Sequence, residues 1–388
     1  MYNVKLVNKI SKVGLNQLGE GYNCSETAEN ADAYLVRSAA LHDEVFPDTL
    51  KCIARAGAGV NNIPIDRCTD AGIVVFNTPG ANANAVKELT LCGLLLASRK
   101  IKLGNRFAES LAGTGDEMSK LVEKGKSQFA GPELKGKTLG VIGLGAIGGP
   151  LANIAVSLGM TVYGYDPYLS VDAAWTLKRE IHHATDLKTI FEVSDYISVH
   201  VPATADTKGF LNAAAFAQMK DGVRIVNFAR GELVNNADMA EALKSGKVAA
   251  YVADFPAEEL LPLDNFTALP HLGASTPESE DNCAVMAANE VRDYLERGII
   301  KNSVNFPAAS LEPTTPFRLC ALHKNVAGIV SALSSAVASE GLNIESVAST
   351  SRKEVAYTIL DLDRAPSEKL IADLEAKDTI FKVRFIQL

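Results

Sequence analysis

The chain has 388 residues, with 38 Lys and Arg against 46 Asp and Glu, so its formal net charge is −8. At roughly 100–200 residues per domain, this length predicts two to three domains, each able to bury a core without disulfides. The acidic average surface disfavours nucleic-acid and anionic-membrane partners, because both would be repelled. The cysteines show no metal-ligand spacing, and the first residues lack the apolar stretch of a signal peptide, so we expect a cytoplasmic protein without a metal site.

The first hundred residues alternate short apolar runs at 4–7, 33–36, 52–54 and 73–76 with helix-length polar segments. Residues 139–255 repeat this scheme, and helices are expected at 81–103 and 277–298. Strands separated by helix-length segments indicate parallel pairing through crossover helices. The sequence therefore predicts an α/β protein with two doubly wound parallel sheets, flavodoxin-like and Rossmann. The substrate-binding domain is expected at 1–97 and 283–307, and the cofactor domain at 98–282.

The segment from Thr138 to Tyr165 carries no formal charge. An uncharged run of about 18 or more residues is the usual indication of a membrane helix. Its glycines, with Pro150 and Asn153, make it a poor lipid-facing helix, whereas strand, glycine-rich turn, helix and strand follow in order. The absence of charge is better explained by burial on both faces of a parallel sheet, so we expect no membrane partner.

The end of the chain has a different composition. Residues 308–316 are rich in Pro, Thr, Ser and Ala and are expected to form a linker. Residues 317–388 follow a βαββαβ pattern, the ferredoxin-like arrangement, with helices expected at 326–340 and 367–376.

A GxGxxG motif follows the strand at 139–143 and opens a helix; it consists of Gly143, Gly145, Ala146, Ile147 and Gly148 around Leu144. The next strand ends in Asp166, close to the spacing of about 20 residues expected for a ribose-binding acid. The glycines allow the backbone to approach a pyrophosphate at the helix N-terminus. Asp166 can bond both ribose hydroxyls and would repel a 2′-phosphate, so the sequence predicts NAD in preference to NADP.

Three polar residues, Arg230, Glu259 and His271, follow successive predicted strands of the cofactor domain. Taken singly, each is better explained without a function: Arg230 and Glu259 as solvated surface side chains and His271 as a helix cap. Together they are expected at the carboxyl edge of the sheet, where such sheets bind ligands. A cation, a carboxylate and an imidazole are also the groups that carbonyl reduction needs.

Six blocks occur in an order that resembles the D-2-hydroxyacid dehydrogenase family. They are ARAGAGVNNIPID (54–66), NTPGANANAVKE (77–88), GVIGLGAIG (140–148), HVPAT (200–204), NFARGELV (227–234) and PHLGAST (270–276). Residues 317–388 separately resemble an ACT domain, a small module that binds amino acids. The combination implies an NAD-dependent enzyme that interconverts 3-phospho-D-glycerate and 3-phosphohydroxypyruvate in L-serine biosynthesis.

The resemblance implies a role for each polar residue. His271 would be the acid–base group, and Glu259 would pair with its imidazole and raise the pKa. A one-residue slip of the match would select Glu258 instead. Arg230 would bind the substrate carboxylate and polarise the carbonyl.

The family match also implies binding residues. For the cofactor these are Val201 and Pro202 along the adenine and ribose path and Asp254 at the nicotinamide carboxamide. For the substrate they are the backbone of Gly57, Ala58 and Gly59, an anion nest for the carboxylate, and Arg37, Ser38, Arg55 and Asn84 for the phosphate.

In the C-terminal segment, His323 and Asn325 match a ligand-binding HxNxPG turn, with Ala327 in place of the proline, and Asn343 matches a further ligand residue. The resemblance implies L-serine bound between paired subunits, and hence a homo-oligomer, a dimer or tetramer. Three alternatives remain: an ACT domain that only dimerises, a glyoxylate or hydroxypyruvate reductase of the same family, and a non-catalytic NAD(H)-sensing binding protein.

Overall fold

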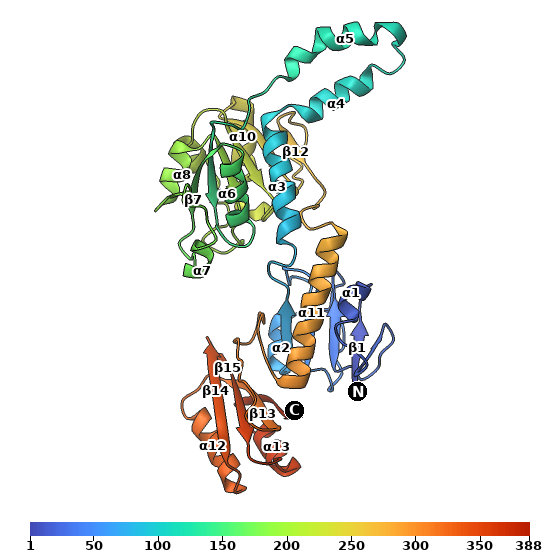
Figure 1. Cartoon of the computed structure of the whole chain (residues 1–388), viewed down its shortest axis with the longest axis vertical. Helices are drawn as coiled ribbons and strands as arrows, with labels where there is room; N and C mark the ends of the chain where they lie inside the picture. Colours follow the sequence, from blue (N-terminus) through green and yellow to red (C-terminus); the bar gives the residue numbers. More distant parts are fainter. The chain divides into compact units, whose positions relative to one another are not determined.

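The computed structural model describes all 388 residues and divides into two compact units. Unit 1 comprises Met1–Asn82 and Pro277–Leu388, and unit 2 comprises Ala83–Thr276 (Figure 1). The division therefore lies at 82/83 and 276/277, where the sequence analysis expected 97/98 and 282/283. Helix α3 (Ala83–Ser98) packs on strands of unit 2 and α11 (Pro277–Arg297) on strands of unit 1, so each helix belongs wholly to one unit.

The main sheet of unit 1 has five parallel strands in the order β2-β1-β3-β4-β5, the flavodoxin-like order that the sequence predicted. The strands are β1 (Tyr2–Leu6), β2 (Tyr22–Ser25), β3 (Ala33–Val36), β4 (Cys52–Arg55) and β5 (Val74–Asn77), with the short helices α1 (Lys12–Leu15) and α2 (Ile65–Asp70). Helix α11 covers one face of this sheet. Its Ala284, Ala287 and Ala288 are buried there, and their small side chains allow the helix to approach closely.

Unit 2 is built on seven parallel strands in the order β12-β11-β10-β9-β6-β7-β8. The strands are β6 (Thr138–Ile142), β7 (Thr161–Tyr165), β8 (His182–His183), β9 (Tyr196–Val199), β10 (Val223–Asn227), β11 (Val248–Ala253) and β12 (Phe266–Ala268). The helices are α3, α6 (Gly148–Ser157), α7 (Val171–Ala174), α8 (Leu187–Val193), α9 (Ala213–Gln218), α10 (Asn236–Ser245) and the 3₁₀ turn η3 (Gly231–Leu233). This is the predicted Rossmann order, which reverses between β6 and β9 and binds ligands at that point.

The uncharged run at 138–165 forms β6, α6 and β7, as the sequence predicted. Both strands lie inside the parallel sheet, which accounts for the absence of charge. No helix in the structure combines the length and the apolar character that crossing a membrane requires.

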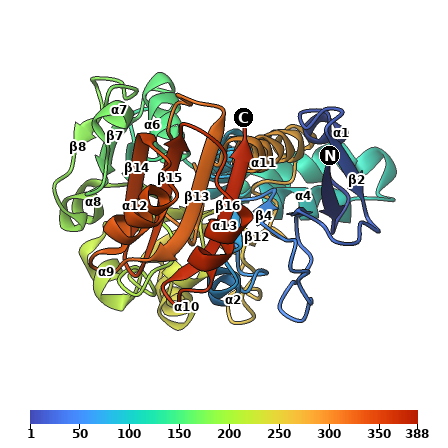
Figure 2. The ribbon, with the colours of Figure 1, turned by 90° about the horizontal axis from the view of Figure 1, so that it is seen from below.

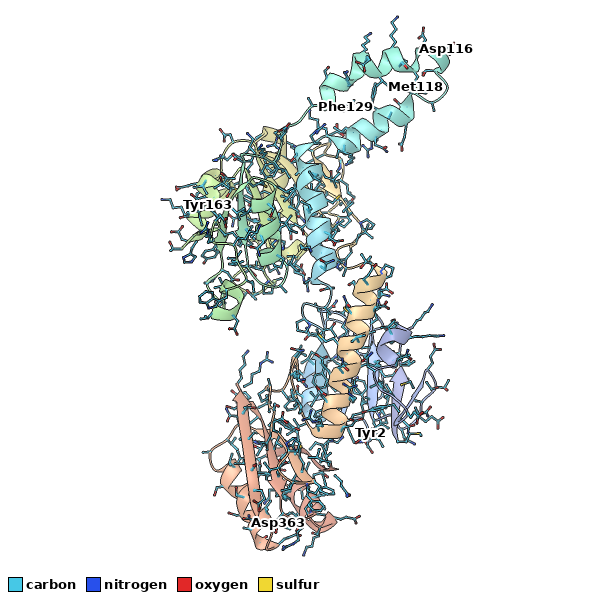
Figure 3. All side chains as sticks on the ribbon, viewed as in Figure 1. Tyr2, Asp116, Met118, Phe129, Tyr163 and Asp363 are labelled. Carbon is cyan, nitrogen blue, oxygen red and sulfur yellow. The ribbon has the colours of Figure 1, made fainter.

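A helical hairpin that the sequence analysis did not anticipate projects from the body of unit 2 (Figure 1). It consists of α4 (Ile101–Ser110), η1 (Gly115–Glu117), α5 (Met118–Gly125) and η2 (Lys126–Phe129). The helix expected at 81–103 instead ends at Ser98. Neither α4 nor α5 contains a buried residue, and the rings of Phe107 and Phe129 lie 5.2 Å apart, tilted by 38°, between the two arms. The side chains of Met118 and Phe129 are labelled in Figure 3.

The C-terminal segment forms a four-stranded antiparallel sheet in the order β14-β15-β13-β16, as the predicted βαββαβ pattern requires. Its elements are β13 (Phe317–Lys324), α12 (Ile329–Ser339), β14 (Ile344–Arg352), β15 (Val355–Leu362), α13 (Glu368–Glu375) and β16 (Ile380–Gln387). Helix α12 begins three residues later than expected, because Gly328 has a left-handed backbone, φ 81°, just before it.

The two faces of this sheet bury different partners. Leu319, Ala321 and Leu360 pack with α12 and α13 on one face. Figure 2 shows these two helices beside the strands of the C-terminal sheet. Cys320 and Tyr357, on the other face, belong to the same buried cluster as α11 and the five-stranded sheet. The expected linker at 308–316 is anchored as well, since Ala309 pairs with Ile300. The C-terminal sheet is thus part of the core of unit 1.

The carboxyl end of α11 is capped by side chains from three other strands. The Arg384 guanidinium (β16) and the Tyr2 hydroxyl (β1) both donate to the carbonyl of Leu295, each at 2.9 Å. Arg318 (β13) donates to the carbonyl of Arg297 at 2.8 Å. Cations at a helix C-terminus satisfy its unpaired carbonyls and oppose its dipole. The capping joins the C-terminal sheet firmly to α11.

Candidate functional site

The glycine-rich loop follows β6 at the point where the strand order of unit 2 reverses. Gly143 has φ 91°, a left-handed conformation that favours glycine. A Cβ at Gly148 would collide with the carbonyl oxygen of Gly143, so the turn can close only without a side chain there. A Cβ at Gly145 would meet no atom within 4 Å. The middle of the loop therefore faces open space, as a backbone that approaches a pyrophosphate must.

Asp166 lies directly after β7 beside this loop. Its carboxylate accepts hydrogen bonds from the backbone N–H groups of Leu144 and Tyr168, each at 2.9 Å. The acid is thus held at the edge of the glycine-rich turn by two backbone donors. An open glycine backbone with a fixed carboxylate beside it fits the pyrophosphate and ribose of a dinucleotide.

Residues 200–202 follow β9 on the other side of the reversal point. The side chain of Val201 lies against Gly143, with 3.1 Å to the position a Cβ would take, and Pro202 is exposed nearby in the chain. The imidazole of His200 is within 2.8 Å of the Ser198 hydroxyl, and its Nδ1 has no partner. Burial lowers the pKa of His200 to about 4, so this ring is neutral and packs beneath the loop.

Asp254 is buried, 1% exposed, directly after β11. One carboxylate oxygen accepts the N–H of Gly273 at 2.9 Å, and its backbone carbonyl accepts the N–H of His271 at 3.0 Å. The other carboxylate oxygen has no partner, and burial raises the pKa of this carboxyl. An unpaired buried acceptor fits an amide donor, such as the carboxamide of a nicotinamide.

His271 lies on an exposed loop with a left-handed backbone, φ 51°. Its ring is 5.2 Å from that of Phe255 and tilted by 50°. The Phe255 side chain also approaches the backbone of Gly231, next to Arg230. The Arg230 guanidinium and the imidazole both lower the pKa of Asp254 by their charge, against the larger effect of burial. The structure therefore gathers a cation, an imidazole and a carboxyl on the loops after β10, β11 and β12.

Glu259 is not part of this group of contacts. Both Glu258 and Glu259 are exposed, and neither makes a hydrogen bond or ion pair with His271. The structure thus does not choose between the two glutamates that the sequence analysis left open.

Sequence reasoning missed Asn227, the fully buried last residue of β10. Its side-chain oxygen Oδ1 accepts the N–H groups of Ala229 and Arg230 at 3.1 and 3.3 Å, and its side-chain amide donates to the backbone carbonyl of Arg230 at 2.8 Å. These bonds shape the turn that presents the guanidinium. The only sequence signal was a polar residue at the end of an otherwise apolar strand.

In unit 1, the loop 57–59 follows β4. The N–H of Gly57 donates to the carbonyl of Arg55 at 2.9 Å, whereas the N–H groups of Ala58 and Gly59 have no acceptor within the chain. The Arg55 guanidinium donates to the carbonyl of Gly59 and, at 2.9 Å, to that of Arg37. Two free N–H groups held beside an arginine form a suitable nest for a carboxylate.

The turn after β3 lies beside this loop. The side-chain oxygen of Asn8 accepts three successive backbone N–H groups, those of Arg37, Ser38 and Ala39, at 2.9 to 3.1 Å. The Arg37 guanidinium forms an ion pair with Glu280 in the first turn of α11, at 2.6 Å. Sequence reasoning identified neither Asn8 nor Glu280, because both lie far from this turn in the chain.

Asn84, the remaining residue proposed for the phosphate, belongs to α3 in unit 2. Its amide donates to Glu88 at 2.8 Å, and its oxygen accepts from Lys87 at 2.5 Å. The structure therefore satisfies this side chain within its own helix.

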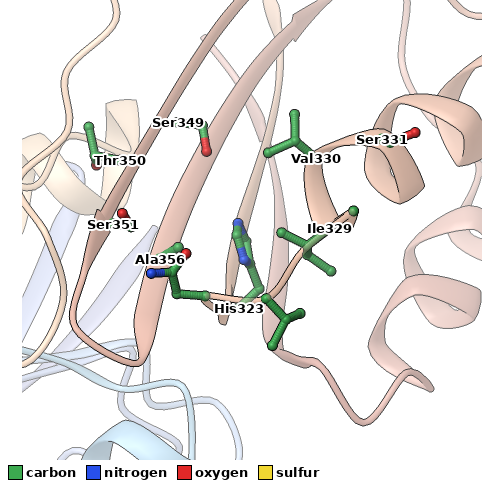
Figure 4. Close-up of a pocket in the computed structure, with 11 residues that line it drawn as sticks. His323, Ile329, Val330, Ser331, Ser349, Thr350, Ser351 and Ala356 are labelled. Atoms are coloured by element: carbon green, nitrogen blue, oxygen red, sulfur yellow. The ribbon is translucent and has the colours of Figure 1, made fainter.

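A cavity of about 220 Å³ opens in the C-terminal sheet (Figure 4). It is lined by His323, Asn325, Val326, Gly328, Ile329, Val330, Ser331, Ser349, Thr350, Ser351 and Ala356. Nδ1 of His323 donates to the carbonyl of Lys324, so Nε2 accepts from the Thr358 hydroxyl, and burial lowers the pKa of the ring. Asn343 does not line the cavity; its amide donates to Glu345.

Comparison with known proteins identifies relatives of the whole arrangement. Residues 94–274 match the family described as D-isomer specific 2-hydroxyacid dehydrogenase, NAD binding domain. The chain is 39% identical over 296 residues to a D-3-phosphoglycerate dehydrogenase of Archaeoglobus fulgidus, covering 73% of this chain and 53% of that protein. It is 31% identical over 337 residues to D-3-phosphoglycerate dehydrogenase 1 of Saccharomyces cerevisiae, covering 81% and 68%.

Among solved structures, the chain is similar to NAD⁺-bound 3-phosphoglycerate dehydrogenase of Entamoeba histolytica, with a TM-score of 0.61 and 26% identity over 78% of this chain and 98% of that one. The chain belongs to the D-2-hydroxyacid dehydrogenase family, and NAD is the cofactor of its matched domain. It spans about half the length of several curated relatives, 53% of the archaeal protein and 60% of one from Bacillus subtilis.

Proposed function

We propose that the protein is an NAD-dependent D-3-phosphoglycerate dehydrogenase, which interconverts 3-phospho-D-glycerate and 3-phosphohydroxypyruvate in L-serine biosynthesis. The observation that carries the proposal is the grouping of Arg230, Asp254 and His271 after three neighbouring strands of an NAD-binding sheet. The names of the relatives in Archaeoglobus and Saccharomyces support the choice of substrate.

His271 donates a proton to the keto oxygen in reduction and removes it from the hydroxyl in oxidation. NADH supplies the hydride when it is bound. Arg230 binds the substrate carboxylate and polarises the carbonyl, because a guanidinium stabilises the negative charge that develops on oxygen. The Asp254 carbonyl, which accepts the N–H of His271, fixes the backbone that carries the imidazole.

Glu259 is proposed as the carboxylate partner of His271, with Glu258 as the alternative. A carboxylate beside an imidazole favours its charged form. Replacing the true partner with Gln shifts the alkaline side of the pH–rate profile for keto-acid reduction towards lower pH, and replacing the other glutamate leaves that profile unchanged. Measuring both single variants assigns the partner.

Unit 1 supplies the groups that bind the carboxylate and the phosphate of the substrate. The free N–H groups of Ala58 and Gly59 bind the carboxylate, and Arg37 and Arg55, with Ser38, bind the phosphate. Asn84 is proposed only as an auxiliary phosphate ligand, since its side chain already has two partners in α3.

The proposal is tested by following NADH oxidation with 3-phosphohydroxypyruvate, hydroxypyruvate and glyoxylate. The expected result is a higher kcat/KM for the phosphorylated acid and loss of turnover in His271→Ala. Equal kcat/KM for the unphosphorylated acids would assign a glyoxylate or hydroxypyruvate reductase. Tight NADH binding without turnover of any of these acids would assign an NAD(H)-sensing protein.

The C-terminal sheet is proposed as an ACT domain that binds L-serine in the cavity at His323 and Asn325, with Asn343 supplied by a second subunit. Four hydroxyl side chains line the cavity, which suits a small polar ligand. Titration calorimetry with L-serine is expected to show saturable heat and inhibition of NADH oxidation. Absence of both up to millimolar concentrations would leave the domain with a structural role.

A homo-oligomer, a dimer or tetramer, is proposed from the hairpin at 101–129. Its helices bury no residue in the monomer, yet Ile101 and Met118 are 50% and 44% exposed, an arrangement that favours cover by a second copy. Sedimentation of the full chain and of a variant with charged residues at both positions tests whether the hairpin mediates self-association.

We also propose a cytoplasmic location, which the six free cysteines support.

A further inference from the structure

Glu290 is a buried carboxyl group that the proposed chemistry does not use. It lies in the middle of α11 and is 4% exposed. One of its oxygens accepts a hydrogen bond from the Asn302 amide at 2.6 Å, and the other has no partner. An ionised carboxylate with an unpaired oxygen is costly in such a place. Burial accordingly raises the pKa of Glu290 to about 8, so the group is mainly neutral at pH 7.

The surroundings of Glu290 contain no cation in contact with it. On its own helix, Asp293 raises the pKa, and Asp293 is itself paired with Lys301 at 2.7 Å. In the segment that follows α11, Lys301 lowers the pKa by its charge and Asn302 by its hydrogen bond. On β4, below the helix, the Cys52 thiol is neutral because burial raises its pKa to about 12. The ionised form of Glu290 is therefore poorly compensated on every side.

A short chain of hydrogen bonds links Glu290 to the loop 57–59. The backbone carbonyl of Asn302 accepts the N–H of Asn77, at the end of β5, at 3.3 Å. The side-chain amide of Asn77 in turn donates to the carbonyl of Ala58 at 2.6 Å. Thr78, the next residue, donates its N–H to the carbonyl of Gly57 at 3.1 Å. The two asparagines are the only intermediates between the buried carboxyl and the proposed carboxylate nest.

We propose that Glu290 is a positioning residue for the substrate-carboxylate nest and that its protonated form favours binding of an anion there. The contact with Asn302 holds Asn77 against the loop, so that the free N–H groups of Ala58 and Gly59 face the ligand. Asn302 donates this hydrogen bond to either form of the carboxyl, so ionisation changes the charge and not the contact. Loss of the proton to solvent leaves an uncompensated negative charge two asparagines away from a site for an anion. That charge weakens binding of the substrate carboxylate. The inference rests on the proposed function of the nest.

The test compares KM for 3-phosphohydroxypyruvate at saturating NADH in the wild type and in Glu290→Gln, from about pH 6 to about pH 9.5. The ratio of the wild-type KM to the variant KM is expected to rise through a single-proton step near pH 8, by about five- to tenfold, while the ratio of kcat stays flat. Ionisations of other groups are common to both proteins and cancel in the ratio. Glu278→Gln, an exposed replacement in the first turn of α11, is the matched control and should track the wild type.

A KM ratio that does not change with pH overturns the inference while leaving the proposed function intact. A wild type that turns over no 2-keto acid overturns the proposed function, and the inference with it. If Glu290→Gln fails to fold, Asn302→Leu provides the second test, because it cuts the chain of hydrogen bonds at its first link. It should raise KM severalfold at neutral pH and move the step above pH 8, because the hydrogen bond that it removes lowers the pKa of Glu290; an unchanged KM overturns the inference.

Discussion

Arg37 has a counter-ion in the structure that any phosphate must replace. Its guanidinium pairs with Glu280, and the two side chains are 44% and 45% exposed. An ion pair this exposed contributes little, about 0–1 kcal/mol, so a doubly charged phosphate can displace it. The displaced carboxylate then remains close to the bound anion and opposes it.

The first prediction follows from that competition. Glu280→Gln should lower KM for 3-phosphohydroxypyruvate by about two- to fivefold, because the competing charge is lost. KM for hydroxypyruvate, which has no phosphate, should not change. The measurement is steady-state NADH oxidation with both acids, and Glu278→Gln serves as the control. An equal fall in both KM values would contradict the assignment of Arg37 to the phosphate.

The second prediction concerns stability and Glu290. The pKa of this group is about 8 in the folded protein against 4.5 as its ordinary value, so the folded state binds more protons than the unfolded state between these values. The free energy of unfolding should therefore fall as pH rises through this window, by up to about 1.4 kcal/mol per pH unit. Glu290→Gln should remove this slope. Urea denaturation of both proteins at about pH 6 and about pH 9 checks it.

At the residue scale, the sequence identified candidate site residues where a polar side chain directly follows a predicted strand and lies at the spacing expected of a known motif. Asp166 and His271 were proposed this way, because the strand, turn and helix around them have local signals. Asn8 and Glu290 had none, and the only signal for Asn227 was its position as a polar residue at the end of a strand. Their roles arise from hydrogen bonds to residues that only the folded chain brings near, and a buried carboxyl in an amphipathic helix looks like a solvated one in the sequence.

At the scale of elements, the glycine-rich turn allows two substitutions with opposite expected outcomes. Gly148→Ala should destabilise the protein, because the new methyl group would collide with the Gly143 carbonyl. Gly145→Ala should leave the melting temperature unchanged, since that position faces open space, but should weaken NADH binding by at least about tenfold by blocking the approach of the pyrophosphate. Calorimetry and NADH fluorescence titration check both. NADH affinity that survives Gly145→Ala would place the cofactor elsewhere.

Most strands of both parallel sheets could be predicted, because they are short apolar runs between helix-length segments. The strands β2, β8 and β12 were not identified, since β2 and β8 are polar and β12 has only three residues. The α4–α5 hairpin could not be predicted either. Its helices bury none of their own residues, so no periodic core pattern distinguishes them from an extension of α3. Helix α3 ends at Ser98, and neither glycine nor proline follows directly to mark that end in the sequence.

At the scale of the whole molecule, the C-terminal sheet and the five-stranded sheet share one core. Cys320, Leu322 and Tyr357 cover Phe76 and Tyr294, all of them buried. The sequence analysis treated 317–388 as a separate module after a linker, because composition reveals a linker but not the contacts made across it. The predicted order of strands was confirmed, and the shared core became visible only in the structure.

A truncated chain of residues 1–316 tests the shared core. It should melt at a lower temperature than the full chain and aggregate, because the apolar face around Tyr294 is uncovered. NADH binding should persist, since the buried clusters of unit 2 contain only residues of unit 2. Scanning calorimetry, light scattering and NADH titration provide the measurements. An unchanged melting temperature would show that the C-terminal sheet is an independent appendage.

The shared hydrogen-bond acceptor at Leu295 has a consequence for the order of folding. Tyr2 and Arg384 donate to the same carbonyl, so the capping of α11 needs side chains that are synthesised almost a whole chain apart. Unit 2 is one uninterrupted stretch, Ala83–Thr276, and can close as soon as that stretch leaves the ribosome. The five parallel strands of unit 1 cannot complete their packing until β16 has been synthesised. During synthesis the unit that binds NAD is therefore ready first, and the unit proposed to bind the acid groups of the substrate is completed last.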